Sequence, residues 1–214
     1  MNYYIMLEAG EGCGKDTQAD KIIPWLQEKG YNVVRTKEPG GTPEAEAIRN
    51  ILTGKALGGD ANLDALEELH LFSSARASNY RHVVIPYKQR APPEGKKGNI
   101  ILKTRGWPST IAYQGHAGRV DLDLIKRHIR DATRGILPDL LLIIDNNPTT
   151  GLSREIDANR FAAKGLAYHQ DVRKGYLAVA EEYPNISVVI PYVDGKIDEM
   201  QETIRRTIGE RLGL

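Results

Sequence analysis

The sequence predicts an α/β fold, in which a parallel sheet of five strands is flanked by helices. Apolar runs rich in Ile, Leu and Val alternate along the chain with longer segments of helical pattern, which is typical of a parallel sheet covered on both faces. The first apolar run also leads straight into a glycine-rich turn and a helix-compatible segment. The expected strands are residues 3–7, 31–36, 99–104, 140–145 and 186–191.

The segments between the strands are expected to be helical near residues 15–29, 43–53, 63–85, 121–134, 161–182 and 196–212. Pro24 falls inside the first of these, and we expect it to kink that helix or to end it early. Residues 88–98 are polar and rich in Pro and Gly, but a strand follows at once, so they are expected to form a surface loop. We therefore expect residues 1–214 to form a single domain.

Composition narrows the function classes. The 214 residues carry a formal net charge of +1, which argues against a surface that coats nucleic acid. No apolar run approaches the ~20 residues needed to span a membrane, and the N-terminus lacks the layout of a secretory signal. The single cysteine, Cys13, has no partner for an internal disulfide, which fits a reducing compartment. We expect a cytoplasmic protein that binds neither nucleic acid nor membranes.

Residues 8–17 read EAGEGCGKDT and join the first expected strand to the first expected helix. A glycine-rich turn lets backbone N–H groups surround an anion, a lysine reaches the β- and γ-phosphates, and a helix N-terminus favours negative charge. The arrangement indicates a phosphate-binding loop (P-loop), although Ala9 and Asp16 depart from the pattern G-x-x-x-x-G-K-[ST]. The alternative is an ordinary tight connection between a strand and a helix.

Further motifs follow in order along the chain. They are TKEPGGT at 36–42, ELHLFSSARA at 68–77, Arg105 with STIAYQG at 109–115, LPDL at 137–140, ID at 144–145, GLSR at 151–154 and VRKGYL at 172–177. Together with the loop they resemble, in order and spacing, the motifs of the thymidylate kinases, the P-loop enzymes that phosphorylate dTMP with ATP. The resemblance covers nearly the whole chain. It implies a fold like that of the nucleoside monophosphate kinases, with strand order 2-3-1-4-5, a short helical lid at about 149–164, and a homodimer.

On the donor side, the resemblance implies that the loop binds ATP. Lys15 would act as a catalytic residue on the transferred phosphate, and Arg154 would join it from the lid, because the loop has no basic residue ahead of Lys15. The alternative for the lid arginines is a solvated helix surface. The ATP-binding residues that the resemblance implies are Gly10, Glu11, Gly12, Cys13, Gly14, Lys15, Asp16, Thr17 and Arg160.

On the acceptor side, the resemblance implies a pocket for dTMP. Arg105 would grip the acceptor phosphate, a task that suits the planar fork of a guanidinium, and would be catalytic. Phe72 and Arg76 lie four residues apart on one helical face and would stack on the base and bond its edge. The alternatives are a solvated loop arginine for Arg105 and a core aromatic for Phe72. The remaining acceptor-binding residues that the resemblance implies are Glu11, Pro39, Thr110, Tyr113 and Gln114.

Two of these residues carry more specific expectations. The bulky side chain of Tyr113, placed under the sugar, would exclude a 2′-hydroxyl and so select deoxyribose. The carboxylate of Glu11 occupies the position that meets the sugar hydroxyl of the acceptor in relatives, and its alternative is an acid that faces solvent.

The pattern breaks near the expected metal. Asp16 stands where a hydroxyl normally binds Mg²⁺, and since carboxylates are good Mg²⁺ ligands it is the expected metal ligand. Thr17 lies about 100° further round the helix and does not replace that hydroxyl. Thr104 replaces the aspartate, and Gly106 the tyrosine, of the family's D-R-Y element. One hypothesis is that the carboxylate lost at Thr104 is regained at Asp16. The other is loss of catalysis.

The expected activity is Mg²⁺-dependent transfer of a phosphoryl group from ATP to dTMP, giving dTDP. One alternative is a nucleotide-binding pseudo-kinase with little activity. Another is a kinase for dUMP or a further deoxynucleoside monophosphate.

Overall fold

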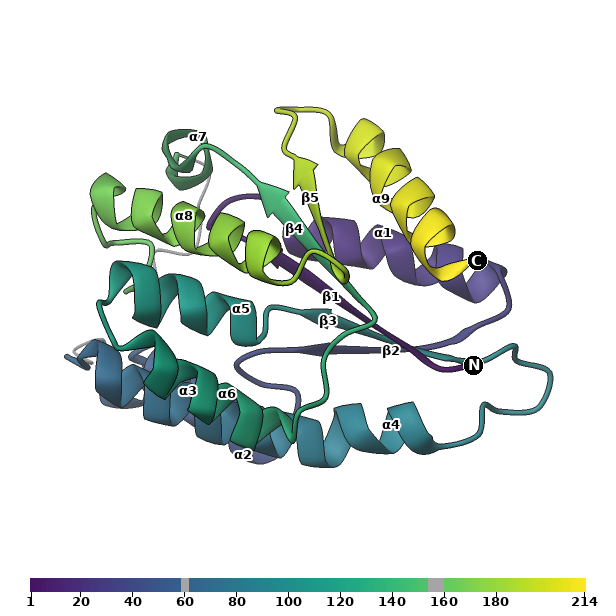
Figure 1. The fold of residues 1–214 in the computed structure, drawn as a ribbon, viewed down its shortest axis with the longest axis horizontal. Helices are drawn as coiled ribbons and strands as arrows, with labels where there is room; N and C mark the ends of the chain where they lie inside the picture. Colours follow the sequence, from purple (N-terminus) through teal and green to yellow (C-terminus); the bar gives the residue numbers. More distant parts are fainter. Residues whose placement is uncertain (59–61, 154–159) are drawn as a thin grey trace.

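The computed structural model describes residues 1–58, 62–153 and 160–214 and is built around one five-stranded sheet (Figure 1). All neighbouring strands are parallel, and their order is β2-β3-β1-β4-β5. This confirms the expected order and fold class. The strands are β1 (Tyr3–Ala9), β2 (Asn32–Lys37), β3 (Asn99–Thr104), β4 (Leu140–Asp145) and β5 (Ser187–Pro191), and every bound lies within two residues of its prediction.

The α-helices among the described residues are α1 (Lys15–Glu28), α2 (Pro43–Leu52), α3 (Ala65–Asn79), α4 (Ile85–Gln89), α5 (Trp107–Thr110), α6 (Leu122–Thr133), α7 (Pro148–Leu152), α8 (Leu166–Glu182) and α9 (Ile197–Leu212). A short 3-10 turn (Lys55–Leu57) follows α2. In the part of the chain that the structure describes, no helix is long and apolar enough to cross a membrane.

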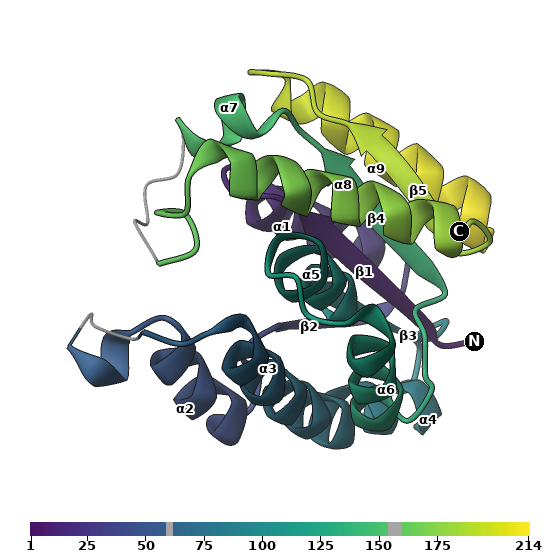
Figure 2. The ribbon, with the colours of Figure 1, turned by 60° about the vertical axis from the view of Figure 1, so that its left-hand side comes forward.

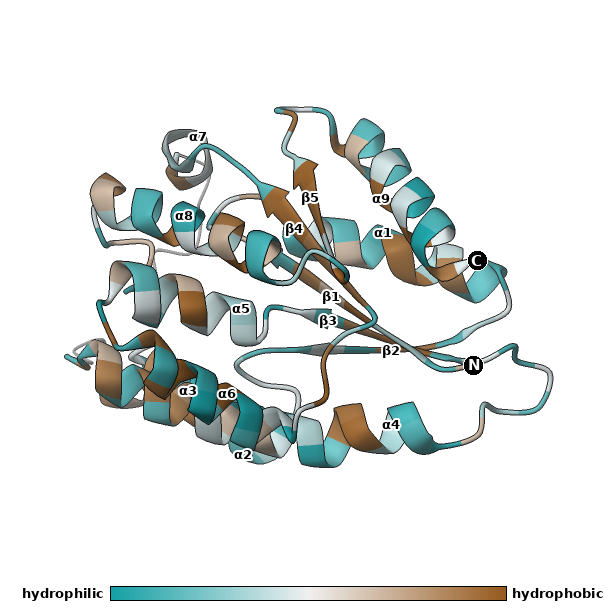
Figure 3. Ribbon diagram, viewed as in Figure 1, coloured by the Kyte–Doolittle hydropathy of each residue, from teal (hydrophilic) through white to brown (hydrophobic). Residues whose placement is uncertain are grey.

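Apolar side chains cover both faces of the sheet, because successive residues of a strand point to opposite sides. One core packs Ile5 and Leu7 of β1 against α1 and α9. The other packs Tyr4 and Met6 of the same strand against α3, α5, α6 and α8. Figure 2 shows these two groups of helices on opposite faces, and Figure 3 shows that the strands between them are mostly hydrophobic. The near-continuous apolar strands of the sequence therefore follow from burial on both faces.

The expected helix at 63–85 is interrupted. An Asp64–Glu67 capping box starts α3, but α3 ends at Asn79, a π-helical turn occupies Tyr80–Val84, and α4 follows. Pro86 sits in the first turn of α4, where its missing N–H costs little. The helical register therefore changes before Pro86, and a periodic pattern read straight through this stretch does not detect that change.

Two further features differ from expectation. Residues 107–117, for which no helix was predicted, form α5 and a π-helical segment (Ile111–Ala117). Conversely, Pro24 does not end α1, which continues to Glu28. The predicted helix at 161–182 begins later, at Leu166, and the predicted lid includes residues 154–159, which lie outside the described residues.

The register of the strands decides where a ligand can bind. Leu7 of β1 and Lys37 of β2 both pair with Thr104 at the end of β3. The loops that follow these three strands therefore leave the sheet side by side, at the carboxyl edge where ligands of open α/β sheets bind.

Candidate active site

The loops after β1, β2 and β3, together with α2 and α3, line a pocket of about 210 Å³ that opens to solvent. All eight residues predicted to bind the acceptor line it, and Lys15 and Asp16 lie at the same pocket. These eight are Glu11, Pro39, Phe72, Arg76, Arg105, Thr110, Tyr113 and Gln114. Residues from five separate segments are thus brought to one cavity beside the phosphate-binding loop.

The loop after β1 has the backbone that the sequence predicts. Gly14 precedes α1 in the left-handed conformation, with φ 65°. Gly12 has the same φ, and a Cβ there would lie 1.9 Å from the carbonyl oxygen of Gly151, so only glycine fits. Lys15 opens α1 and is mostly buried, and this burial, with Arg105 nearby, lowers the pKa of its ammonium. A helix N-terminus and a lysine thus meet at the pocket, as an anion site requires.

Arg105 is held in an unusual conformation at the centre of the pocket. Its φ is 62°, a value rare for a residue with a side chain, and its N–H donates to the Leu7 carbonyl oxygen at 3.0 Å. Its Nη2 lies 2.9 Å from Oε1 of Glu11, which also accepts the Tyr113 hydroxyl at 2.8 Å. Burial opposes ionisation of Glu11, but Arg105 and Lys15 hold its pKa below the usual range. The result is a charged cluster that is formed before any ligand binds.

Glu8, which the sequence reading did not select, holds the loop that carries Arg105. This carboxylate at the end of β1 is fully buried and accepts from the Gly106 N–H at 2.7 Å and the Ser109 hydroxyl at 2.8 Å. The Tyr176 hydroxyl donates to Oε2 of Glu8 at 3.2 Å, the oxygen that also accepts from Ser109. Burial raises the pKa of Glu8 to about 7, against the opposing effect of Arg105. The sequence signal that could have identified this role is a single acidic residue directly after an apolar run.

One wall of the pocket contains Phe72 and Arg76, both from α3. Arg76 is only 1% exposed, and it donates from Nη2 to the Thr110 hydroxyl at 2.7 Å and from Nε to Glu38 at 2.9 Å. Its Nη1 is buried and has no hydrogen-bond partner among the described residues. Because an unpaired buried donor is costly, this atom is suited to a ligand acceptor. Phe72 lies 6.1 Å from Phe161, centroid to centroid, at the same cavity.

Gln114 belongs to a second buried cluster at the far end of the pocket. Its Nε2 donates to Oε2 of Glu68 at 2.7 Å, and Glu68 is fully buried. Arg160 forms an ion pair with Oε1 of Glu68 at 2.8 Å and donates to the Leu63 carbonyl oxygen at 2.8 Å. The structure therefore places Arg160 against the acceptor-side helix α3. Its predicted role in binding ATP stays a prediction, and Arg154, the other lid arginine, lies outside the described residues.

Asp16 lies at the edge of the pocket with its side chain 58% exposed. Its carboxylate is 3.0 Å from Nη2 of Arg35 and 3.6 Å from Nζ of Lys15, and these charges hold its pKa low despite partial burial. Among the described residues no cluster of three or more His, Cys, Asp or Glu side chains is present. One ionised carboxylate beside a phosphate site nevertheless fits Mg²⁺, which is usually held by one or two carboxylates and substrate phosphates.

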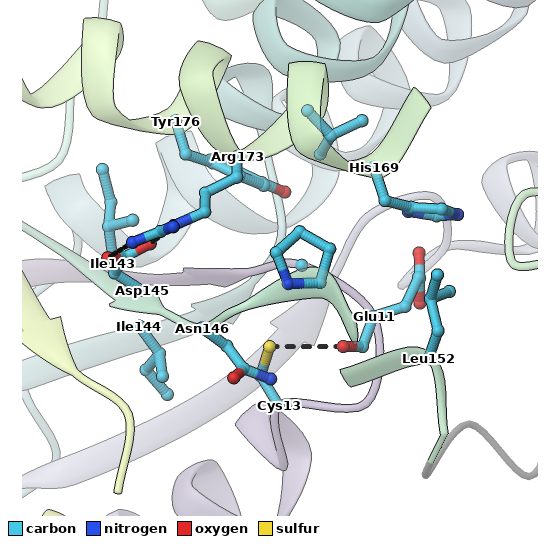
Figure 4. Close-up of a pocket in the computed structure, with 13 residues that line it drawn as sticks. Glu11, Cys13, Ile143, Ile144, Asp145, Asn146, Leu152, His169, Arg173 and Tyr176 are labelled. Carbon is cyan, nitrogen blue, oxygen red and sulfur yellow. Dashed lines mark hydrogen bonds and ion pairs between the residues drawn. The ribbon is translucent and has the colours of Figure 1, made fainter. Parts of the chain in front are cut away.

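Cys13 faces away from this pocket, toward a smaller cavity between the loop, β4 and α8 (Figure 4). Its thiol is buried, donates to the Glu11 carbonyl oxygen at 3.3 Å, and has a raised pKa because of that burial. Arg173 and Asp145 form an ion pair at the other side of the cavity. The geometry supports the interpretation of Cys13 as a small residue that packs within a tight turn.

Comparisons with known proteins point to one family. Residues 7–204 match the family model described as Thymidylate kinase. A thymidylate kinase of Gloeobacter violaceus is 38% identical over 186 residues, which cover 85% of this chain and 82% of that protein. One of Caulobacter vibrioides is 36% identical and covers 99% and 98%. The crystal structure of thymidylate kinase from Ehrlichia chaffeensis superposes with a TM-score of 0.72 at 26% identity, covering 97% of this chain and 98% of that chain.

Proposed function

The chain belongs to the thymidylate kinase family, and on that premise we propose that it phosphorylates dTMP to dTDP with ATP in the pocket described above. The chain is a kinase and a phosphotransferase of nucleotide biosynthesis. The observation that carries the proposal is the convergence of an anion-binding loop, the Arg105–Glu11–Tyr113 cluster and the unpaired Nη1 of Arg76 on one cavity.

The donor phosphates are bound by the backbone of the glycine-rich loop and by Lys15. Gly10, Gly12 and Gly14 leave room for the phosphates, while the N-terminus of α1 favours their negative charge. Lys15 neutralises charge on the oxygens of the transferred group, which is how phosphoryl transfer is mainly catalysed. Arg154 adds to this charge from the lid. These roles stay proposals, supported by the position of Lys15 at the pocket.

Asp16 holds Mg²⁺ in this proposal, together with oxygens of the donor phosphates. When bound, Mg²⁺ neutralises part of the phosphate charge and orients the transferred group. The carboxylate of Asp16 lies at the edge of the pocket, and Lys15 and Arg35 keep it ionised. Thr104 has no charge with which to bind the metal ion. The hypothesis that Asp16 replaces the acid missing at Thr104 is retained on this ground.

The acceptor is held at both of its ends. Arg105 binds its phosphate and aims it at the donor, since its guanidinium already faces Glu11 and the loop. Phe72 stacks on the base, and Nη1 of Arg76 donates to a carbonyl oxygen on the edge of the base. Tyr113 crowds the 2′-position, so deoxyribose is favoured. Pro39, Thr110 and Gln114 complete the pocket wall.

Three finer statements belong to the same proposal. Residues 1–214 form a single domain with a lid at about 149–164, the enzyme is a homodimer, and it works in the cytoplasm. The resemblance to the family motifs supports the first two, and the lone Cys13 fits the third.

The test is release of ADP from ATP and Mg²⁺ with dTMP, run beside dUMP, dCMP and AMP and repeated with Mn²⁺. Turnover selective for dTMP is expected. Comparable rates with several acceptors would instead favour a broader deoxynucleoside monophosphate kinase. An absence of turnover while dTMP still raised the melting temperature would indicate a pseudo-kinase, in which Thr104 and Asp16 have removed the chemistry but not the binding.

A further inference from the structure

Lys103 is a fully buried lysine in the third strand, and neither the P-loop nor the acceptor motifs account for it. Its exposed fraction is 0%, although it belongs to a sheet whose interior is mostly apolar. Lysine is almost never fully buried unless its charge is paired, because loss of hydration costs several kcal/mol. A buried ammonium therefore needs a reason, and the contacts of Lys103 supply one.

The contacts of Lys103 lead toward the pocket. Its Nζ donates to Oε1 of Glu38 at 2.5 Å and to Oδ1 of Asn79 at 2.9 Å, and it lies 4.4 Å from the ring centre of Tyr80. Asn79 is fixed in turn by the hydroxyl of Thr36 at 2.7 Å. Lys103 does not itself line the pocket, so it meets a ligand only through Glu38.

Glu38 joins this lysine to Arg76. Its Oε1 faces Lys103 and its Oε2 accepts from Nε of Arg76 at 2.9 Å, and both Glu38 and Arg76 are buried. Nε is on one edge of the guanidinium, Nη2 is held by Thr110, and the remaining Nη1 has no partner among the described residues. The plane of the guanidinium, and so the direction of Nη1, depends on where Glu38 sits.

We propose that Lys103 is a positioning residue: it holds Glu38, and through Glu38 it aims Nη1 of Arg76 at a carbonyl oxygen on the pyrimidine edge of the acceptor. This inference rests on the proposed function, because it assigns the acceptor to this pocket. Lys103 and Arg76 carry two positive charges but share the single buried carboxylate of Glu38. The cluster therefore favours an acceptor nucleotide with a hydrogen-bond-accepting oxygen on the edge of its base. A 4-carbonyl, as in dTMP, satisfies Nη1. The 4-amino group of dCMP presents a donor to it and is rejected.

The test compares the wild type with Lys103→Met, Glu38→Gln and the double variant, using initial rates with dTMP, dCMP and ATP varied in turn. Lys103→Met keeps the length of the side chain but removes its charge. We expect KM for dTMP to rise about tenfold and the preference for dTMP over dCMP to shrink by a similar factor. Both kcat and KM for ATP are expected to stay within about twofold, since the donor site is untouched.

The double variant decides whether Lys103 acts through Glu38. If it does, Lys103→Met adds little once Glu38 is already changed, so the two effects are non-additive. Lys37→Met is the matched control, because it removes a cation at the same sheet edge that pairs with Glu46 instead. We expect it to leave KM for dTMP within about twofold of the wild type.

Three results would overturn the proposal. They are a melting temperature that falls in Lys103→Met while KM for dTMP and the dTMP preference stay unchanged, equal rises in KM for dTMP and ATP, or additive effects in the double variant. If Lys103→Met does not fold, Lys103→Gln is measured instead. It removes the charge but keeps a donor for Glu38, so we expect a smaller rise in KM for dTMP, still without a rise in KM for ATP, and an unchanged KM for dTMP with a lowered melting temperature would overturn the proposal. If the wild type lacks turnover, the proposed function fails by itself, and calorimetric Kd values for dTMP in the same variants decide the inference.

Discussion

The half of the pocket proposed to bind the acceptor and the half proposed to bind the donor are built differently. On the acceptor side, Arg76 and Glu38 are 1% and 4% exposed and are bonded to one another inside the fold. On the donor side, the side chain of Asp16 is 58% exposed and pairs with Arg35 at the surface.

The difference indicates how each nucleotide is selected. Side chains that are fixed by buried hydrogen bonds keep one geometry, so they can fit one base and exclude another. A glycine-rich backbone and a helix N-terminus recognise phosphate, which every nucleoside triphosphate carries. We therefore expect changes on the acceptor side to alter selectivity, and changes at Asp16 to alter metal use.

The largest expected effect is at Arg105, where the two halves meet. Arg105→Met should lower kcat/KM about a thousandfold, because it removes the cation for the acceptor phosphate and leaves Glu11 without its partner. Initial rates with dTMP measure it. Arg119→Met is the control, since Arg119 shares the left-handed φ, at 61°, but is exposed and should retain activity. Retained activity in Arg105→Met would place the centre of the site elsewhere.

The next effect concerns stability and tests how firmly the Arg105 loop is held. The folded protein binds a proton at Glu8 more tightly than the unfolded chain does, because burial raises the pKa of Glu8 from 4.5 to about 7. The free energy of unfolding should therefore fall as pH rises through this window, by about 3 kcal/mol, and then level off.

Glu8→Gln should lack this pH-dependent contribution. Urea unfolding of the wild type and Glu8→Gln between pH 4.5 and 8 measures the difference, and the exposed Glu181→Gln serves as the control. Parallel pH profiles for the wild type and Glu8→Gln would show that Glu8 is ionised over the whole range and that Arg105 outweighs its burial.

A smaller effect should separate base recognition from catalysis. Arg76→Met should raise KM for dTMP about thirtyfold and change kcat less, because in the proposed function Arg76 binds the base edge rather than the transferred group. Steady-state rates with dTMP and ATP varied separately measure it, and the exposed Arg81→Met is the control. A matching rise in KM for ATP would mean that the two halves are not separable.

The smallest effect is expected at Asp16. Asp16→Ser should lower activity about fivefold and raise the Mg²⁺ concentration needed for half-maximal rate, because a hydroxyl is a weaker ligand than a carboxylate. Magnesium titrations of the initial rate measure both. Thr104→Asp placed in the Asp16→Ser background should restore activity. Higher activity in Asp16→Ser alone would contradict the idea that Asp16 compensates for Thr104.

The elements that local pattern dictates were predictable. Apolar runs marked all five strands within two residues, and the resemblance to the thymidylate kinases implied the sheet order that the structure has. The change of helical register before Pro86 was missed, because a π-helical turn has no marker in a 3.6-residue pattern. The helical residues 107–117, most of them π-helical, were not predicted as a helix at all.

For the site, the sequence by itself determined the glycine-rich loop with its lysine and, through the family resemblance, indicated the eight residues that the structure brings to one pocket. Only the tertiary structure decided what holds them. Lys103 meets Glu38 across 65 residues, and Glu8 meets Gly106 across 98. Such pairs depend on strand register and on burial, which raises the strength of a charge contact but has no signature in the neighbouring sequence.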